Sequence, residues 1–186
     1  MNEDIFSFSP KLLVSSPSLL DPNFFRSLVL IFQHDTDGAL GLVVNRRTQY
    51  PAQEVTKSLK IQWDSNEQKM IGVGGPVEPQ SLWFLHSSED MFDESVAIGD
   101  TLAVSRSENA LRALCSRDDP YLSLFVGYSG WGPGQLENEI RDGDWMLTDL
   151  DIPLIFGTAP EAQWIGAFEK IGVNPAHLIS VGGLIQ

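Results

Sequence analysis

The sequence predicts an α+β fold: a single compact domain over residues 1–186, in which a coiled, largely antiparallel, barrel-like sheet has several helices packed outside it. Predicted strands outnumber predicted helices, and several strands are joined by turns of hairpin length. The chain is 42% hydrophobic and has ten Phe and five Trp, enough apolar side chains for a substantial core. Its 186 residues match the length of about one ordinary domain. Residues 1–8 are expected to form a loose N-terminal segment.

The first elements are predicted from apolar runs and turn residues. Residues 10–16 and 27–34 have the composition of strands. The turn sequence at 35–38 (DTDG) then leads into a further strand over 39–45, which predicts a hairpin. The strands of this hairpin are almost continuously apolar, so we expect both of their faces to be covered. A short helix is predicted after Pro51.

The middle of the chain predicts strands and one amphipathic helix. The predicted strands cover residues 70–74, 81–86, 95–98 and 101–104. The last two are separated by Gly99-Asp100 and are expected to form a small hairpin. Ser105 and Glu108 have the spacing of a capping box, which predicts a helix over about 106–117.

The last third predicts alternating strands and helices. Strands are expected over 121–128 and 145–150, with a helix between them that starts at Pro133 and stops at Gly143. Thr158 and Glu161 have the spacing of a second capping box, and Gly172 is expected to end the helix that follows.

Charge and cysteine content exclude several classes of function. The chain has 25 acidic against 12 basic residues and a formal net charge of -13. Because affinity for nucleic acid depends on clustered Lys and Arg, direct nucleic-acid binding is not expected, nor is attachment to an anionic membrane. Cys115 is alone, so an internal disulfide or a cysteine zinc site cannot form. With an acidic start and no long apolar run, the protein is expected to be cytoplasmic.

The most unusual segment is residues 127–137 (GYSGWGPGQLE), where a predicted strand leads into a predicted helix. Its glycines allow close approach of the backbone, and Trp131 offers a ring for stacking. One interpretation is a binding surface; the other is a tight connection whose glycines relieve steric conflict and whose tryptophan belongs to the core. The carboxylates between residues 137 and 151 are interpreted as a solvated face.

Catalytic interpretations of the same residues are weaker. Ser129 falls short of the Gly-x-Ser-x-Gly nucleophile motif, because Trp131 stands where the second glycine is needed. His34 and His86 end separate predicted strands and could meet in space, but their spacing does not match a metal-binding motif. We therefore predict no metal and no cofactor. The turn at 21–23 precedes Phe24 and Phe25, of which at least one ring must be buried.

Together, these blocks resemble the AlgH/YqgE family of bacterial proteins. The resemblance runs from about residue 9 to residue 183 and rests on blocks in a fixed order: 11–17 (KLLVSSP), 21–24 (DPNF), 26–28 (RSL), His34, 38–46 (GALGLVVNR), 74–77 (GGPV), 85–86 (LH) and 127–137. The chain departs from the family pattern at Arg47, where proline is usual, and at Ser129, where alanine is typical. An alanine at that position argues against an essential serine nucleophile.

The resemblance implies a cytoplasmic α+β domain of coiled antiparallel sheet with outer helices, and it implies little chemistry. Some members of the family are described as candidate transcriptional regulators linked to alginate production, without a recognised DNA-binding motif. Our first hypothesis is therefore a non-enzymatic binding or regulatory protein that acts through a protein partner or a small ligand. Its binding residues would be Asn23, Phe24, His34, His86, Tyr128, Trp131, Gly132, Gln135 and Glu137. The alternative is a hydrolase or phosphate-ester enzyme that uses Ser129 or a His34/His86 site.

Overall fold

The computed structural model describes residues 11–64 and 68–182, and the predicted loose segment over residues 1–8 lies outside them. The strands are β1 (Lys11–Ser15), β2 (Leu28–Asp35), β3 (Gly38–Val43), β4 (Arg47–Pro51), β5 (Met70–Val73), β6 (Val77–Ser87), β7 (Val96–Ile98), β8 (Leu102–Ser105), β9 (Ser123–Trp131) and β10 (Trp145–Asp149). The helices are α1 (Ala52–Ser58), α2 (Glu108–Cys115), α3 (Gln135–Arg141), α4 (Ile152–Gly157), α5 (Pro160–Ile171) and α6 (Pro175–Gly182).

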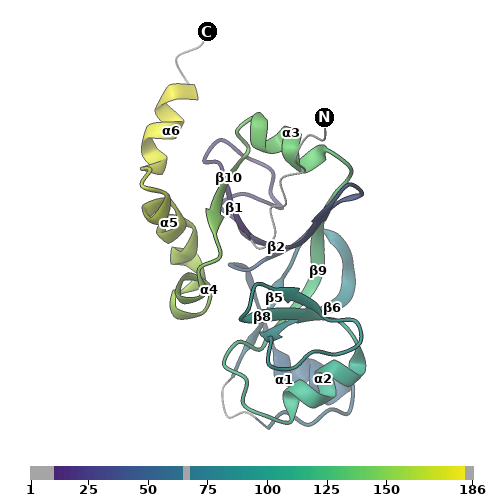
Figure 1. Cartoon of the computed structure of the whole chain (residues 1–186). Helices are drawn as coiled ribbons and strands as arrows, with labels where there is room; N and C mark the ends of the chain where they lie inside the picture. Colours follow the sequence, from purple (N-terminus) through teal and green to yellow (C-terminus); the bar gives the residue numbers. More distant parts are fainter. Residues whose placement is uncertain (1–10, 65–67, 183–186) are drawn as a thin grey trace.

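These strands form one sheet whose two halves share β9 (Figure 1). The first half-sheet has the order β10-β1-β2-β3-β9, and the second contains β4, β5, β9, β6, β8 and β7. Every pairing is antiparallel except that of β5 with β9. The predicted α+β class and largely antiparallel sheet are confirmed. Within the described residues the sheet does not close into a barrel, because its path ends at β10 and at β7.

Three apolar clusters hold the layers together. The central cluster combines side chains from both half-sheets with α4 and α5, among them Leu30, Phe125 and Phe168. A second cluster joins the other face of the second half-sheet to α1 and α2, and a third joins the other face of the first half-sheet to α3. Alternate residues of β2 enter different clusters, since Leu30 faces the central one and Ile31 the third. Both faces of the first hairpin are therefore covered, as predicted.

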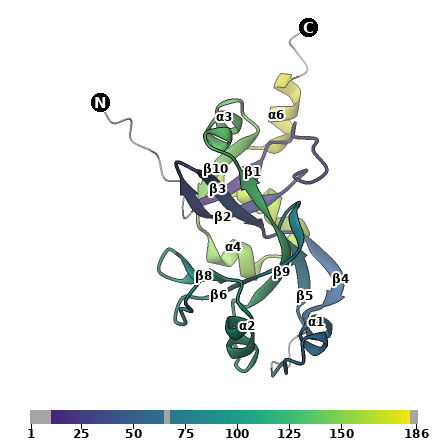
Figure 2. The same ribbon diagram turned by 90° about the vertical axis from the view of Figure 1, so that its right-hand side faces the viewer.

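The helices lie around the sheet at three places (Figures 1 and 2). α3 lies at the end of the first half-sheet, α1 and α2 lie against the second, and α4, α5 and α6 follow one side of the molecule. Trp164 in α5 donates from Nε1 to the carbonyl oxygen of Ser15 in β1, at 2.9 Å, which fixes this side to the sheet. Among the described residues, none of the helices combines the length and the apolar character needed to cross a membrane.

Glycines allow β9 to bend where it passes from one half-sheet to the other. Gly127 has a φ of +67°, and a Cβ at this position would lie 2.5 Å from the carbonyl oxygen of Gly75. Gly75 has a φ of +154°, and its Cβ would lie 2.3 Å from the carbonyl oxygen of Tyr128. The two backbones touch here, so only glycine fits at either position.

Both predicted capping boxes are wrong. The N-cap of α2 is Ser107, whose side chain accepts from the N–H of Ala110, whereas Ser105 belongs to β8. The N-cap of α5 is Ala159, and Thr158 is instead the C-cap of α4, a helix that the sequence analysis did not predict. α6 was also not predicted. Gly172 ends α5 in the left-handed conformation, with a φ of +78°, as expected.

Candidate functional site

The segment over residues 127–137 is mostly strand. β9 continues as far as Trp131, three residues beyond its predicted end, and only residues 132–134 connect it to α3. Gly134 has a φ of +70° and directly precedes the helix. Trp131 is 6% exposed and belongs to the third apolar cluster. The segment therefore fixes α3 against the sheet. Its loop is shorter than the sequence indicated.

An aromatic cluster surrounds Trp131, and we call Phe24, Trp131, Trp145, Gln135 and Glu139 the Trp131 cluster. The Phe24 ring stacks on Trp131 with centroids 6.1 Å apart and meets Trp145 edge-on at 5.3 Å. The Nε1 atoms of Trp131 and Trp145 donate to Glu139 Oε2, at 2.8 and 2.9 Å. Gln135 Nε2 donates to Glu139 Oε1 at 2.8 Å, and Gln135 Oε1 accepts from the N–H of Gly132 at 3.0 Å. One carboxylate thus binds two indoles and an amide.

His34 lies beside this cluster. It is the second-last residue of β2 and lies opposite Ala39 of β3, which in turn pairs with Trp131. The side chain of His34 is 1% exposed, and its Nε2 lies 2.7 Å from Glu137 Oε1. The carboxylate of Glu137 is one-third exposed, so this hydrogen bond links the buried histidine to the surface of α3.

Negative charge gathers around the same helix. Burial, together with the charges of Glu139 and Asp142, raises the pKa of Asp144 above its usual range. Asp142 is exposed, and Arg141 on α3 donates to Asn138. The surface next to the Trp131 cluster is therefore acidic.

His86 lies at the opposite end of β9. Its neighbour Leu85 pairs with Ser123, whereas His34 is adjacent to the pairing of Trp131. Ser123 and Trp131 bound the strand, so roughly 25 Å of extended chain separates the two sites. The structure therefore does not bring His34 and His86 together.

The His86 ring is buried in a chain of hydrogen bonds. Its Nδ1 lies 2.8 Å from the carbonyl oxygen of Ser87, which can only accept, so Nδ1 carries the proton. Its Nε2 lies 2.8 Å from Ser105 Oγ, which is 2.5 Å from Ser95 Oγ. Burial lowers the pKa of His86, outweighing the opposite effects of Ser87 and Asp119. The neutral ring thus accepts from Ser105.

The remaining predicted residues lie in different surroundings. Ser129 is fully buried, and its hydroxyl donates to the carbonyl oxygen of Gly74 at 3.0 Å, so a main-chain oxygen and not a base holds its proton. Tyr128 packs edge-on against Trp83, at 5.5 Å, beside the central cluster. Asn23 is exposed, and its N–H donates to Asp21 in a turn. Phe24 and Asn23 therefore accompany the Trp131 cluster, whereas Tyr128 and His86 do not.

The described residues contain neither a group of metal ligands nor a reactive thiol. No group of three or more His, Cys, Asp or Glu side chains in this part of the chain is arranged to hold a metal ion. Cys115 is buried in α2, and burial, with a smaller effect of Asp64, raises its pKa to about 11. Its thiol therefore stays protonated at neutral pH.

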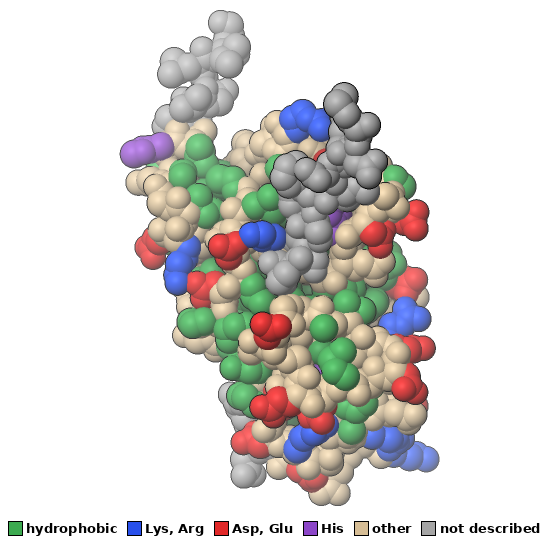
Figure 3. Space-filling view, viewed as in Figure 1, with side chains coloured by type: hydrophobic (Ala, Val, Ile, Leu, Met, Phe, Trp, Pro, Cys, Tyr) green, Lys and Arg blue, Asp and Glu red, His purple; other side chains and the backbone are tan. Residues whose placement is uncertain are grey.

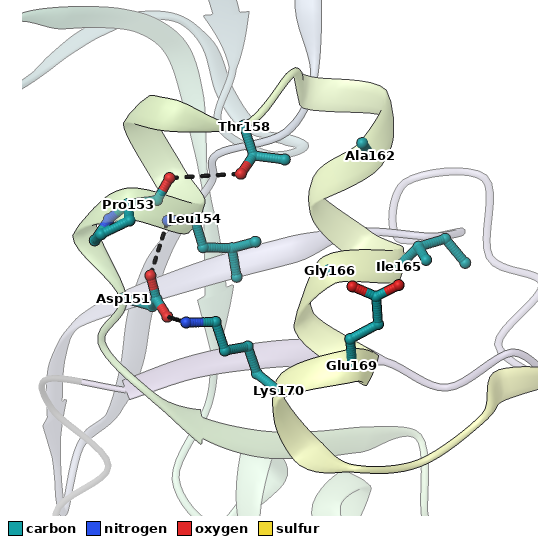
Figure 4. Close-up of a pocket in the computed structure, with 9 residues that line it drawn as sticks. All are labelled: Asp151, Pro153, Leu154, Thr158, Ala162, Ile165, Gly166, Glu169 and Lys170. Atoms are coloured by element: carbon teal, nitrogen blue, oxygen red, sulfur yellow. Dashed lines mark hydrogen bonds and ion pairs between the residues drawn. The ribbon is translucent and has the colours of Figure 1, made fainter.

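A groove that the sequence did not predict lies between α4 and α5 (Figure 4), on the side of the molecule where Figure 3 shows hydrophobic side chains at the surface. It has a volume of about 610 Å³, and its lining includes Leu154, Ala162 and Ile165. Asp151 caps α4 by accepting from the N–H of Leu154 at 2.8 Å, and it pairs with Lys170 of α5 at 2.6 Å. The hydrogen bond from Lys170 lowers the pKa of Asp151. Asp151 before Pro153 was a helix-start signal that could have revealed α4.

The fold and the surface around α3 define a class of mixed α/β protein with a two-part sheet and an aromatic site at one end. Comparison with known proteins identifies that class. A family model described as AlgH-like matches residues 12–176, so the chain belongs to the AlgH-like family. The predicted resemblance is confirmed.

Relatives and solved structures extend this result. A UPF0301 protein of Stenotrophomonas maltophilia is 36% identical over 95% of this chain and 96% of its own length. A UPF0301 protein of Xylella fastidiosa is 36% identical over 93% of this chain and 94% of its own. The solution structure of the AlgH protein from Pseudomonas aeruginosa matches with a TM-score of 0.75 and 28% identity, covering 100% of this chain and 98% of that one. A Corynebacterium diphtheriae protein, at 22% identity and a TM-score of 0.68, shares the fold; the match covers 87% of this chain and 86% of that one.

Proposed function

We propose that this chain is a non-enzymatic, cytoplasmic binding protein that acts through a protein partner. The partner would bind over the Trp131 cluster, on the segment formed by residues 16–27. The observation that carries this proposal is a pair of exposed apolar side chains on a segment that the sheet holds in place. Leu20 is 76% exposed and Phe25 is 44% exposed.

The segment is fixed at two places by Phe24 and by Arg46. Phe24 packs its ring between Trp131 and Trp145. The guanidinium of Arg46 donates to the carbonyl oxygens of Pro22 and Phe25, at 2.9 and 3.0 Å. A binding loop that is already ordered loses little conformational entropy when a partner docks, so its apolar side chains contribute more to affinity.

Asn45 adds a further fixed point. Its Nδ2 donates to the carbonyl oxygen of Arg26 at 2.9 Å, and its Oδ1 accepts from the N–H of Leu28 at the same distance. Asn45 and Arg46 are consecutive in the connection that follows β3, so this connection holds the second half of the 16–27 segment. This supports a functional surface on that segment, because these hydrogen bonds order a solvent-exposed loop and are not part of the core.

Charge defines the kind of partner. Asp21 and Arg26 are charged and exposed on the segment, Asn23 is exposed and neutral, and exposed Asp142 and partly exposed Glu137 lie on neighbouring α3 and its end. Interfaces of this type place apolar anchors at the centre and polar groups at the rim. We therefore expect a protein partner with an apolar pocket and a basic rim.

The groups considered for catalysis support binding and not turnover. The Ser129 hydroxyl is engaged by a main-chain carbonyl, His34 by Glu137 and His86 by Ser105 and Ser87. A nucleophile needs an adjacent base within hydrogen-bond reach. Each of these groups instead lies in a separate structural contact.

The test uses exposed residues, because replacing the buried Trp131 would report on folding. A Leu20→Ser/Phe25→Ser variant is compared with wild type and with a control, Tyr50→Ser/Met91→Ser, whose side chains are 67% and 51% exposed elsewhere. Each is used to capture proteins from a bacterial lysate, and the captured protein is then purified and its affinity measured. We expect wild type and control to bind equally, and the Leu20/Phe25 variant at least about tenfold more weakly. Equal binding by all three folded proteins would refute the proposal.

A further inference from the structure

A second pocket lies where the second half-sheet meets the connection between α4 and α5. Its volume is about 220 Å³, smaller than the roughly 300–1,000 Å³ of typical drug-sized ligand pockets. The lining is mainly polar and includes Arg47, Lys69, Ser123, Thr158 and Gln163. Among the described residues, two basic side chains and no carboxylate line it, although acidic residues outnumber basic ones twofold in the sequence.

The side chain of Arg47 is held in this pocket by the space above Gly72 and by the ring of Phe125. It opens β4 opposite Gly72 of β5, and Gly72 pairs in turn with Phe125. The guanidinium carbon of Arg47 lies 5.0 Å from the centre of the Phe125 ring. A Cβ on residue 72 would lie 2.7 Å from Arg47 Nη1 and 2.3 Å from the Phe125 ring, so glycine leaves the space that the guanidinium occupies.

The guanidinium has an unmet hydrogen-bond requirement. Arg47 Nη1 is buried and has no hydrogen-bond partner in the described part of the chain, where no carboxylate pairs with Arg47 either. Burial lowers its pKa, yet arginine stays charged in proteins. The cationic guanidinium lies against the Phe125 ring without a carboxylate from the described residues, so an anion from outside the chain can complete the site.

Neighbouring groups specify what else the ligand carries. Lys69 Nζ lies 3.3 Å from the carbonyl oxygen of Asp119 and adds a second positive charge. Gln163 is 1% exposed, and its Nε2 donates to the carbonyl oxygens of Ile155 and Thr158. Its Oε1 is buried without a hydrogen-bond partner in the residues described, so it can accept from a ligand.

We propose that this pocket binds a small anion, a carboxylate or a phosphate, that also carries a hydrogen-bond donor. Arg47 and Lys69 would bind the anionic group, and Gln163 Oε1 would accept from the donor. Bidentate pairing with a planar carboxylate or with phosphate oxygens is the interaction for which a guanidinium is best suited. This pocket is separate from the 16–27 segment, so either proposal can fail alone.

Calorimetric titration at constant ionic strength tests the site with three anions: inorganic phosphate, lactate and acetate. Sodium chloride is the control for a general effect of salt. Saturable binding of phosphate alone identifies a phosphate ligand, and of lactate alone a hydroxycarboxylate. Acetate lacks a donor at neutral pH and should bind at least about fivefold more weakly than lactate. Equal binding of acetate and lactate would overturn the role of Gln163. Binding of neither phosphate nor lactate would overturn the site.

Two variants identify the residue responsible. Arg47→Gln should lose at least about tenfold in affinity, whereas Arg106→Gln removes the same charge from an exposed position and should bind as wild type does. Retained anion binding by folded Arg47→Gln would refute the proposal, as would equal loss in both variants.

Discussion

The carboxylate of Glu139 should be among the most important polar groups for stability. It accepts from the indole N–H groups of Trp131 and Trp145, which are 6% and 2% exposed. A hydrogen bond to a charged group contributes about 1.5–3 kcal/mol, so Glu139→Ala leaves two donors that together lose about 3–6 kcal/mol. Water can reach this half-buried position and replace part of that loss. We therefore expect Glu139→Ala to lower the free energy of unfolding by about 3–4 kcal/mol.

Glu139→Gln provides the matched control, because its amide oxygen can still accept from the indoles. This variant should lose only about 1–2 kcal/mol. Urea unfolding followed by far-UV circular dichroism measures both, since tryptophan fluorescence would respond to the lost contact itself. With a slope of about 2 kcal/mol/M, the midpoint of Glu139→Ala should fall by about 1.5–2 M. A loss below about 1 kcal/mol for alanine, or equal losses for both variants, would refute the assignment.

Two further predictions concern His86 and Ser129. Burial lowers the pKa of His86 below the usual histidine value of about 6.5, so below about pH 6.5 the unfolded chain binds more protons than the folded one and stability falls as the pH drops. His86→Gln should flatten this dependence in urea titrations between about pH 8 and 5; an unchanged slope would contradict it. Ser129→Ala should cost about 0.5–1.5 kcal/mol, because the Gly74 carbonyl keeps its bond from the N–H of Val43. A loss above about 3 kcal/mol by thermal unfolding would exclude this account.

Local signals predicted the elements whose determinants are local. The first hairpin followed from apolar runs on either side of a turn, and its alternate residues fill two clusters. The end of α5 followed from Gly172, because only a left-handed residue closes the helix there. The Ser105 capping box failed because a tertiary contact outcompeted a local one: its hydroxyl serves buried His86, and Ser107 takes the cap instead.

The candidate site depended on contacts between distant parts of the chain. Phe24 reaches Trp131 only because β3 pairs with β9, and Trp145 joins them only because β10 pairs with β1. No local pattern specifies these registers.

Glu139 belonged to a run of carboxylates interpreted as a solvated face, yet its side chain turns inward to two indoles. Arg47 carried no signal as a ligand group, since its cradle is formed by Gly72 and Phe125 from two other strands.

The sharing of β9 between both half-sheets has a consequence for synthesis on the ribosome. β1 can pair with β10 only after residues 145–149 have left the ribosome. β3 and β6 can pair with β9 only after residues 123–131 have done so. Neither half can therefore complete its pairing while the N-terminal two-thirds of the chain is being made, and ordering is delayed until long loops can close. During that interval the apolar strands β1 to β3 have unpaired edges, so we expect the nascent chain to be prone to aggregation until β9 and β10 have been made.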